Sequence, residues 1–110
     1  MIVAFTSKGT DLNSELDSSF GRAAYFVYYN TETNEVKYTD NRANAENAHG
    51  VGPKSAQAVL EAGTELLITG NIPGNNAMNI LQKEKIEIYS PTEKLSLKEL
   101  YELYKMQNNK

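Results

Sequence analysis

The spacing of the apolar residues changes partway along the chain, and this change constrains the fold more than any other feature. Up to residue 40, apolar residues form short runs or alternate with polar ones, which is typical of β-strands. Beyond Gly52 they recur at intervals of three and four residues, typical of helices, with short apolar runs in between. We therefore expect an N-terminal part made of strands and a C-terminal part in which helices and strands alternate.

Five strands are predicted. Asn30–Asn34 has the composition of a turn and joins the second and third strands in a hairpin. The run Ile2–Phe5 is apolar throughout, which predicts a strand covered on both faces. The predicted strands are Ile2–Phe5, Ala24–Tyr29, a stretch around Val36 and Tyr38, Leu66–Thr69, and Ile86–Tyr89.

Three helices are predicted. The first has Pro53 at its first helical position, where the missing N–H costs nothing, and Gly63 just after its end. The second is defined by the apolar spacing within 77–81. Ser96 and Glu99 form a capping box that begins the third.

The element order β-β-β-α-β-α-β-α predicts the topology of the sheet. Strands joined by helices are expected to be parallel, with right-handed crossovers, while the hairpin supplies one antiparallel strand. We expect an α/β fold with ribonuclease-H-like topology: a five-stranded mixed sheet of order 3-2-1-4-5 with three helices. At 110 residues the chain has the size of one domain, so residues 1–110 are predicted to form a single domain.

Composition limits the function classes. The formal charge is −3, and the Lys and Arg residues form no basic stripe, so nucleic-acid binding is not expected. The chain has no cysteine, which excludes disulfides and thiolate-ligated metal sites. No apolar run approaches membrane-spanning length and no signal peptide is recognisable, so no membrane partner is expected and the cytoplasm is the expected location.

The topology also predicts where a ligand binds. Strands one, three, four and five should run in one direction, so the loops Ser7–Arg22, Asn41–Gly52 and Gly70–Asn75 meet at one edge of the sheet. Open α/β sheets bind ligands at that edge. Two helix N-termini, near Gly52 and Gly74, should point into the same crevice, and their backbone N–H groups suit an anion.

Two sets of candidate site residues follow. The first set comprises the predicted anion- or cofactor-binding residues, which are Arg22, Gly70, Asn71, Gly74 and Asn75. The alternative for this set is that the glycines serve a turn, the asparagines cap a helix and the arginine lies on the surface. The second set is His49, which is the only histidine and the candidate metal ligand; the alternative is an ordinary surface histidine.

Other groups of residues favour simpler interpretations. Asp11, Glu15 and Asp17 do not have the spacing of an EF-hand, and a solvated loop is predicted for them. The tyrosines of 24–29 lack adjacent basic residues, so packing is expected rather than base stacking. The first strand carries no carboxylate of the kind that two-metal nucleases need, and no catalytic triad is recognisable, so an enzyme is not expected.

Four segments are informative together: the N-terminal strand, Phe20–Phe26, His49–Pro53 and Ile68–Ala77. In their order and spacing they resemble the dinitrogenase iron–molybdenum cofactor biosynthesis family. The resemblance covers nearly the whole chain and implies a ribonuclease-H-like fold and the binding of iron–sulfur precursors of the nitrogenase cofactor. It also implies that His49 occupies the place of a loop histidine or cysteine implicated in cluster binding in some members.

These observations predict a non-catalytic carrier of an anionic metal cluster or oxo-metallate. The cargo expected from the resemblance is a loosely bound iron–sulfur or molybdenum-containing cluster, with metal-cluster assembly proteins as partners and a monomer or homodimer as the assembly. The alternative is a metal-free protein-interaction or regulatory module. It would pair with its partner through an exposed strand edge, at Val36 and Tyr38 or at Ile86 and Ile88.

Overall fold

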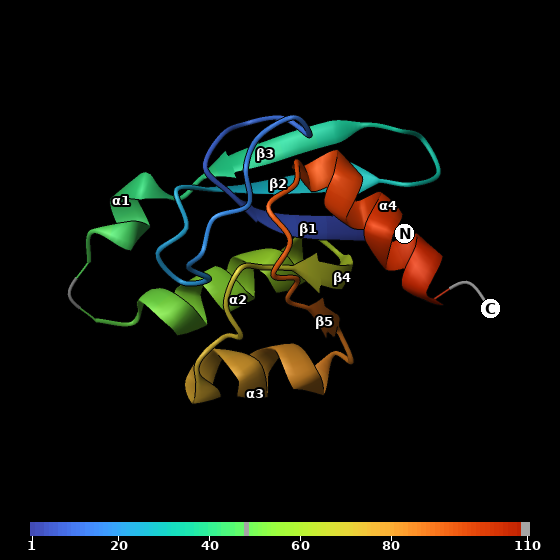
Figure 1. Cartoon of the computed structure of the whole chain (residues 1–110). Coiled ribbons are helices and arrows are strands. Elements are labelled where there is room, and N and C mark those ends of the chain that lie inside the picture. The colour runs from blue at the N-terminus through green and yellow to red at the C-terminus, as the bar shows by residue number, and fades with distance from the viewer. Residues whose placement is uncertain (48, 109–110) are drawn as a thin grey trace.

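The structure is a computed structural model that describes residues 1–47 and 49–108. Five strands and four helices follow one another along the chain (Figure 1). In order they are β1 (Ile2–Ser7), β2 (Tyr25–Asn30), β3 (Val36–Asp40), α1 (Arg42–Ala45), α2 (Val51–Glu61), β4 (Thr64–Ile68), α3 (Asn75–Lys83), β5 (Glu87–Tyr89) and α4 (Leu97–Asn108).

The strands form one mixed sheet in the order β3-β2-β1-β4-β5. β2 pairs antiparallel with both β1 and β3, whereas β1, β4 and β5 pair in parallel. The mixed α/β fold and the predicted strand order 3-2-1-4-5 are therefore confirmed. The hairpin lies on one side of β1 and the strands reached through helices lie on the other.

Helices cover both faces of the sheet and produce two hydrophobic cores. Alternation along β1 sends Ala4 to the face covered by α2 and α3, and sends Val3 and Phe5 to the face covered by α4. Val3, Ala4 and Phe5 are all fully buried. Burial on both faces explains why the sequence of this central strand is a continuous apolar run.

Two helix predictions were wrong in detail. The predicted helix count of three omits α1, a helix of 4 residues with no buried side chain. So short an element has too few residues to show a helical period. α2 begins at Val51 rather than at Pro53, so the proline occupies the third helical position, where the N–H would still lack a helical acceptor.

The predicted helix ends are confirmed where capping chemistry marks them. Gly63 follows the last residues of α2 with φ +81°, the left-handed conformation that glycine adopts at low cost. At the start of α4, the Ser96 amide donates to Glu99 Oε1 (3.0 Å) and the Glu99 amide donates to Ser96 Oγ (3.2 Å). These reciprocal bonds are the capping box.

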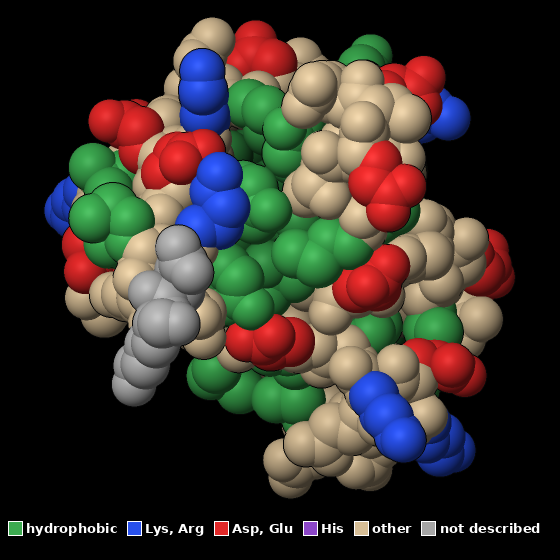
Figure 2. Space-filling model, turned by 90° about the vertical axis from the view of Figure 1, so that its right-hand side faces the viewer, with side chains coloured by type: hydrophobic (Ala, Val, Ile, Leu, Met, Phe, Trp, Pro, Cys, Tyr) green, Lys and Arg blue, Asp and Glu red, His purple; other side chains and the backbone are tan. Residues whose placement is uncertain are grey.

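The end of the sheet where β1 begins is shown in Figure 2. Hydrophobic side chains are exposed in the middle of this face, and charged side chains surround them. No helix within residues 1–47 and 49–108 combines the length and the apolar character needed to cross a membrane.

Candidate functional site

The loops predicted to meet at one edge of the sheet do so. Figure 1 shows β1, β3 and β4 pointing towards the end of the molecule that carries α1 and the first turns of α2 and α3. This is the edge at which open α/β sheets bind ligands. The candidate site is therefore built where the N-termini of α2 and α3 lie.

The N-termini of α2 and α3 lie against each other at two small residues. A Cβ added to Gly52, in the first turn of α2, would lie 3.6 Å from Cβ of Ala77, in the first turn of α3. Gly21 also lies close to this turn of α2, because a Cβ there would lie 3.1 Å from Cα of Gly52. Small side chains at these positions let the two helix starts and the loop before β2 converge.

The electrostatics of this junction favour a negatively charged ligand. The Ncap residues of α2 and α3 are Gly50 and Gly74, and neither helix has a side-chain cap. Neither helix has an acidic residue in its first turn. The partial positive charges of both helix starts are therefore not offset by a carboxylate of their own first turns.

His49 lies at the start of α2, one residue before the Ncap Gly50, and its side chain is exposed. Among residues 1–47 and 49–108, no three His, Cys, Asp or Glu side chains are grouped so that they could hold a metal ion. A metal bound by His49 would therefore need ligands from outside this part of the chain.

Arg22 holds the loop that leads to His49. Its Nη1 donates to the backbone carbonyl oxygens of Ala45 (2.6 Å) and Asn47 (3.1 Å). The predicted role was pairing with an oxyanion. The structure shows the guanidinium engaged with the end of α1 and the segment after it, so its observed contacts are those of a loop brace.

Three polar residues that the sequence did not single out complete this brace. Asn41 Nδ2 and Ser55 Oγ both donate to the carbonyl oxygen of Gly21, at 3.0 and 2.9 Å. Asn44 Nδ2 contacts Ser55 Oγ at 3.2 Å, which ties α1 to α2. The sequence offered only a polar loop rich in asparagine, which does not indicate which partners its amides will find.

Asp17 also departs from expectation, because it is not a solvated loop residue. Its Oδ1 accepts the amide of Ser19 at 2.9 Å and its Oδ2 accepts the amide of Ala24 at 3.1 Å. The carboxylate therefore fixes the turn before β2. The bond to the amide two residues later is typical of an Asx turn, so the Asp-Ser-Ser sequence was an available signal.

The predicted anion loop divides into two parts with different partners. The amide of Gly70 donates within the protein, to Asp17 O (3.2 Å) and Thr6 Oγ1 (3.3 Å). A Cβ at Gly70 would lie 2.5 Å from both Asp17 O and Ser18 Cα, so close approach of this chain segment explains the glycine. Asn71 accepts the Thr69 hydroxyl through its carbonyl oxygen at 3.1 Å.

The second part of the loop is exposed and belongs to the start of α3. Gly74 and Asn75 are its Ncap and first residue, and both are exposed. Of the predicted loop residues, these two lie at the helix junction, whereas the amide of Gly70 is engaged inside the fold. The junction therefore consists of the first turns of α2 and α3, with His49 and the Arg22 brace beside them.

A groove of about 620 Å³ opens along the same edge of the sheet. Its lining carries both charges, including Lys8, Lys94, Glu15 and Glu93, and Gly70 is the predicted site residue in its wall. Lys8 and Glu15 pair with each other at 3.3 Å. This mixed lining does not select a ligand of one charge, in contrast to the helix junction.

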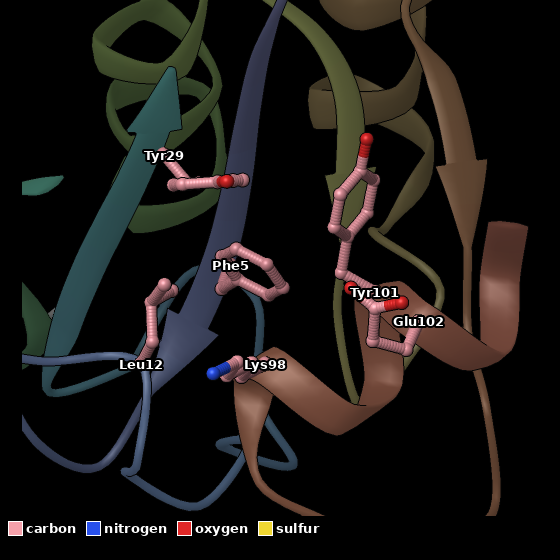
Figure 3. A pocket seen from close by; sticks show the side chains of 6 residues that line it. All are labelled: Phe5, Leu12, Tyr29, Lys98, Tyr101 and Glu102. Carbon is pink, nitrogen blue, oxygen red and sulfur yellow. The ribbon is translucent and has the colours of Figure 1, made fainter. Parts of the chain in front are cut away.

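A much smaller cavity of about 50 Å³ lies beneath α4 (Figure 3). Phe5 projects into it between Leu12 and Tyr29 on one side and Tyr101 of α4 on the other. The volume admits a few water molecules. It is too small for a metal cluster, so it is a gap in packing rather than a ligand site.

The chain is similar over nearly its whole length to a known protein family and to solved structures. The profile of the dinitrogenase iron–molybdenum cofactor family matches residues 1–107. No curated protein matches the chain. The apo form of the orange protein from Desulfovibrio gigas is 31% identical with a TM-score of 0.88, over 96% of this chain and 88% of that one.

A second solved structure, a putative NifB protein from Thermotoga assigned to the DUF35 family, is 33% identical with a TM-score of 0.80. The match covers 96% of this chain and 87% of that one. Both the sequence profile and the structural similarity extend over nearly the whole chain, and the chain belongs to the dinitrogenase iron–molybdenum cofactor family.

Proposed function

We propose that this protein is a non-catalytic carrier of an anionic metal-containing cargo, such as an iron–sulfur or molybdenum-containing cofactor precursor or an oxo- or thiometallate. The observation that carries the proposal is the junction of two helix N-termini beside an exposed histidine. Membership of a family described by the iron–molybdenum cofactor supports a cargo of this class.

The junction supplies attraction without a closed metal site. The first-turn amides of α2 and α3 donate to anion oxygen or sulfur atoms, and the helix dipoles favour the negative charge. His49 supplies one exchangeable imidazole ligand, and Arg22 acts on it indirectly by holding the loop through Ala45 and Asn47. One protein ligand plus backbone donors binds weakly.

Weak binding suits a carrier because the cargo must leave again. Cluster-assembly proteins are the proposed partners that load and unload it. The orange protein was solved in an apo form, so this relative folds without its ligand. Catalysis is not part of the proposal, because the residues described around the junction include no paired acid and base.

The direct test is a thermal-shift titration. Molybdate, tetrathiomolybdate and a reconstituted iron–sulfur precursor are each added to the purified protein, with sodium chloride of equal ionic strength as the control. A ligand that binds only the folded state raises the melting temperature increasingly with its concentration. If none of the three raises it at millimolar concentration, the carrier proposal is wrong.

The His49→Ala variant tests whether the histidine takes part in binding. Because His49 is exposed, its removal should change the free energy of unfolding by less than about 0.5 kcal/mol, as surface substitutions usually do. The ligand-induced rise in melting temperature should fall sharply. Glu46→Gln, an exposed change in the same loop, is the matched control and should keep the rise. If His49→Ala keeps the full ligand-induced rise in melting temperature, the site does not include the histidine.

A further inference from the structure

The outer edge of β3 has no partner strand within the part of the chain that the structure describes. All five of its residues are exposed, including the side chains of Val36 (39%) and Tyr38 (56%). The strand contains no proline and its pairing with β2 is continuous over five residue pairs. An open strand edge of this kind is a template for pairing with another strand.

Alternation of the backbone groups decides which residues of β3 offer hydrogen bonds at this edge. The carbonyl oxygen of Glu35 accepts the amide of Asn30 at 2.9 Å, and the amide of Asn41 donates to Ala24 O at 2.9 Å. Both bonds point towards β2. Because direction alternates along an antiparallel strand, the N–H and C=O groups of Val36, Tyr38 and Asp40 point outward.

We propose that a second copy of this chain pairs there, with its β3 antiparallel to the first and Tyr38 on the two-fold axis. The three outward residues are spaced symmetrically about Tyr38. In this register Tyr38 pairs with Tyr38 of the second copy, and Val36 pairs with Asp40 in both directions. Every outward N–H and C=O then has a partner, as an isologous interface requires.

Neighbouring registers leave groups unpaired. A pairing centred on Lys37 places two lysines directly opposite each other, which is unfavourable, and leaves Asp40 without a partner in the other β3. A pairing centred on Thr39 leaves Val36 without one. The symmetry of the outward groups therefore selects the pairing centred on Tyr38.

The side chains agree with this register. An aromatic pair on the two-fold axis is favourable, and Tyr25 supports the Tyr38 ring edge-to-face with ring centres 6.0 Å apart. The charge of Asp40 is already paired with Arg42 Nη2 at 2.7 Å, so Val36 of the second copy meets a neutralised carboxylate. Lys37 pairs with Glu35, the residue just before β3 of the same copy, at 3.5 Å.

A hollow of about 370 Å³ on the α2 side of the sheet leaves room beside β3. Lys37, Tyr38 and Thr39 line it together with Ala62 at the end of α2. On this side of the sheet, α2 therefore leaves open space next to the edge of β3. The dimer has one continuous sheet, and the two cargo junctions lie at opposite ends of it. The pairing of β3 does not involve a junction, so the inference does not depend on the proposed cargo.

Single-cysteine variants test the register. The chain contains no cysteine, so Tyr38→Cys supplies its only thiol, and two such thiols face each other across the axis. Mild oxidation should give a disulfide-linked dimer. Lys37→Cys is the matched control and should cross-link at least about tenfold more slowly, because in this register it faces Thr39 of the second copy. Equal rates, or faster linking of Lys37→Cys, would overturn the proposal.

Charged substitutions at Tyr38 test whether this residue lies on the two-fold axis, without the need for a covalent bond. Sedimentation of the unmodified protein should show a dimer whose population rises with concentration. Tyr38→Lys and Tyr38→Glu should each be monomeric, because like charges meet on the axis, and an equimolar mixture of the two should dimerise again. Met106→Lys, a change at a residue 76% exposed on α4, should leave dimerisation unchanged. A monomeric unmodified protein at all concentrations, or a mixture that stays monomeric, would refute it.

Discussion

At the scale of single residues, the glycines of the loop between β4 and α3 serve different purposes. Gly70 lies under the segment 17–18, where the chain comes so near that a Cβ has no room. A Cβ at Gly74 would have no neighbour within 4 Å, and its φ of −65° suits any residue. The first glycine is fixed by packing and the second is free to vary.

This difference predicts opposite outcomes for two matched substitutions. Gly70→Ala should lower the free energy of unfolding by about 1–3 kcal/mol, because the new methyl group overlaps backbone atoms that cannot easily move. Gly74→Ala should change it by less than about 0.5 kcal/mol, because a poorer Ncap is offset by the lower entropy of the unfolded chain. Urea denaturation of both variants measures the difference. Equal effects would mean that segment 17–18 yields to the methyl group.

At the scale of elements, α2 and α3 end in the same way with different residues. Each helix is followed by a residue with positive φ: Gly63 (+81°) after α2 and Lys85 (+57°) after α3. Glycine adopts this conformation at little cost, whereas a residue with a Cβ is strained. The end of α3 therefore carries a strain that the end of α2 avoids.

Placing a glycine after α3, and a residue with a Cβ after α2, should change the free energy of unfolding in opposite directions. Lys85→Gly should raise the free energy of unfolding by about 0.5–1 kcal/mol by relieving strain at the end of α3. Gly63→Ala should lower it by about 1 kcal/mol or more. Thermal unfolding monitored by circular dichroism measures both. A destabilising Lys85→Gly would show that the lysine side chain contributes more than its backbone conformation costs.

The capping box of α4 makes the stability of this helix depend on pH. The hydrogen bond from the Ser96 amide lowers the pKa of the Glu99 carboxyl below its usual value. Because the pKa is lower in the folded state, the ionised carboxylate stabilises the fold above the pKa of the unfolded chain, about 4.3. This contribution is lost as the pH falls through the lower, folded-state pKa.

Glu99→Gln should therefore flatten the acid side of the stability profile below about pH 4.3. Ser96→Ala, which removes the other half of the box, should cost about 1 kcal/mol at neutral pH. Urea denaturation between pH 3 and 7 distinguishes these effects. An unchanged acid profile in Glu99→Gln would assign the pH dependence to other carboxylates, among them Asp40, whose pKa is lowered to about 2 by its hydrogen bond to Arg42.

At the scale of the whole molecule, one sheet is shared by two cores. β1 contributes Ala4 to the core under α2 and α3, and contributes Val3 and Phe5 to the core under α4. Because β1 is part of both cores, unfolding of either core would disrupt the other as well. The molecule should therefore unfold as one cooperative unit.

Leu97→Ala tests this cooperativity. Leu97 is fully buried between α4 and the sheet, so its truncation should lower the free energy of unfolding by about 2–5 kcal/mol. Far-ultraviolet circular dichroism and tyrosine fluorescence should still report one coincident transition at a lower urea concentration. Separate transitions would show that α4 detaches independently. Leu103→Ala, at a half-buried position on the same helix, is the control and should cost less.

The sequence by itself determined the sheet order, the direction of the strands and the edge where the loops meet. These follow from local signals, because the spacing of apolar residues reports which faces are buried, and the hairpin and crossover rules then leave few topologies. Capping residues such as Gly63, Ser96 and Glu99 were also readable, since their partners lie within three residues. The helix α1 was not, because four residues carry no period.

Only the tertiary structure decided what the candidate site residues contact. Arg22 reaches carbonyl groups more than 20 residues away, and the Gly70 amide finds Thr6 and Asp17 from a distant part of the sequence. Partners of this kind depend on where the folded chain brings each segment, and no local pattern records it. The convergence of Gly21, Gly52 and Ala77 at the helix junction has the same origin, since small residues become informative only when their neighbours are known.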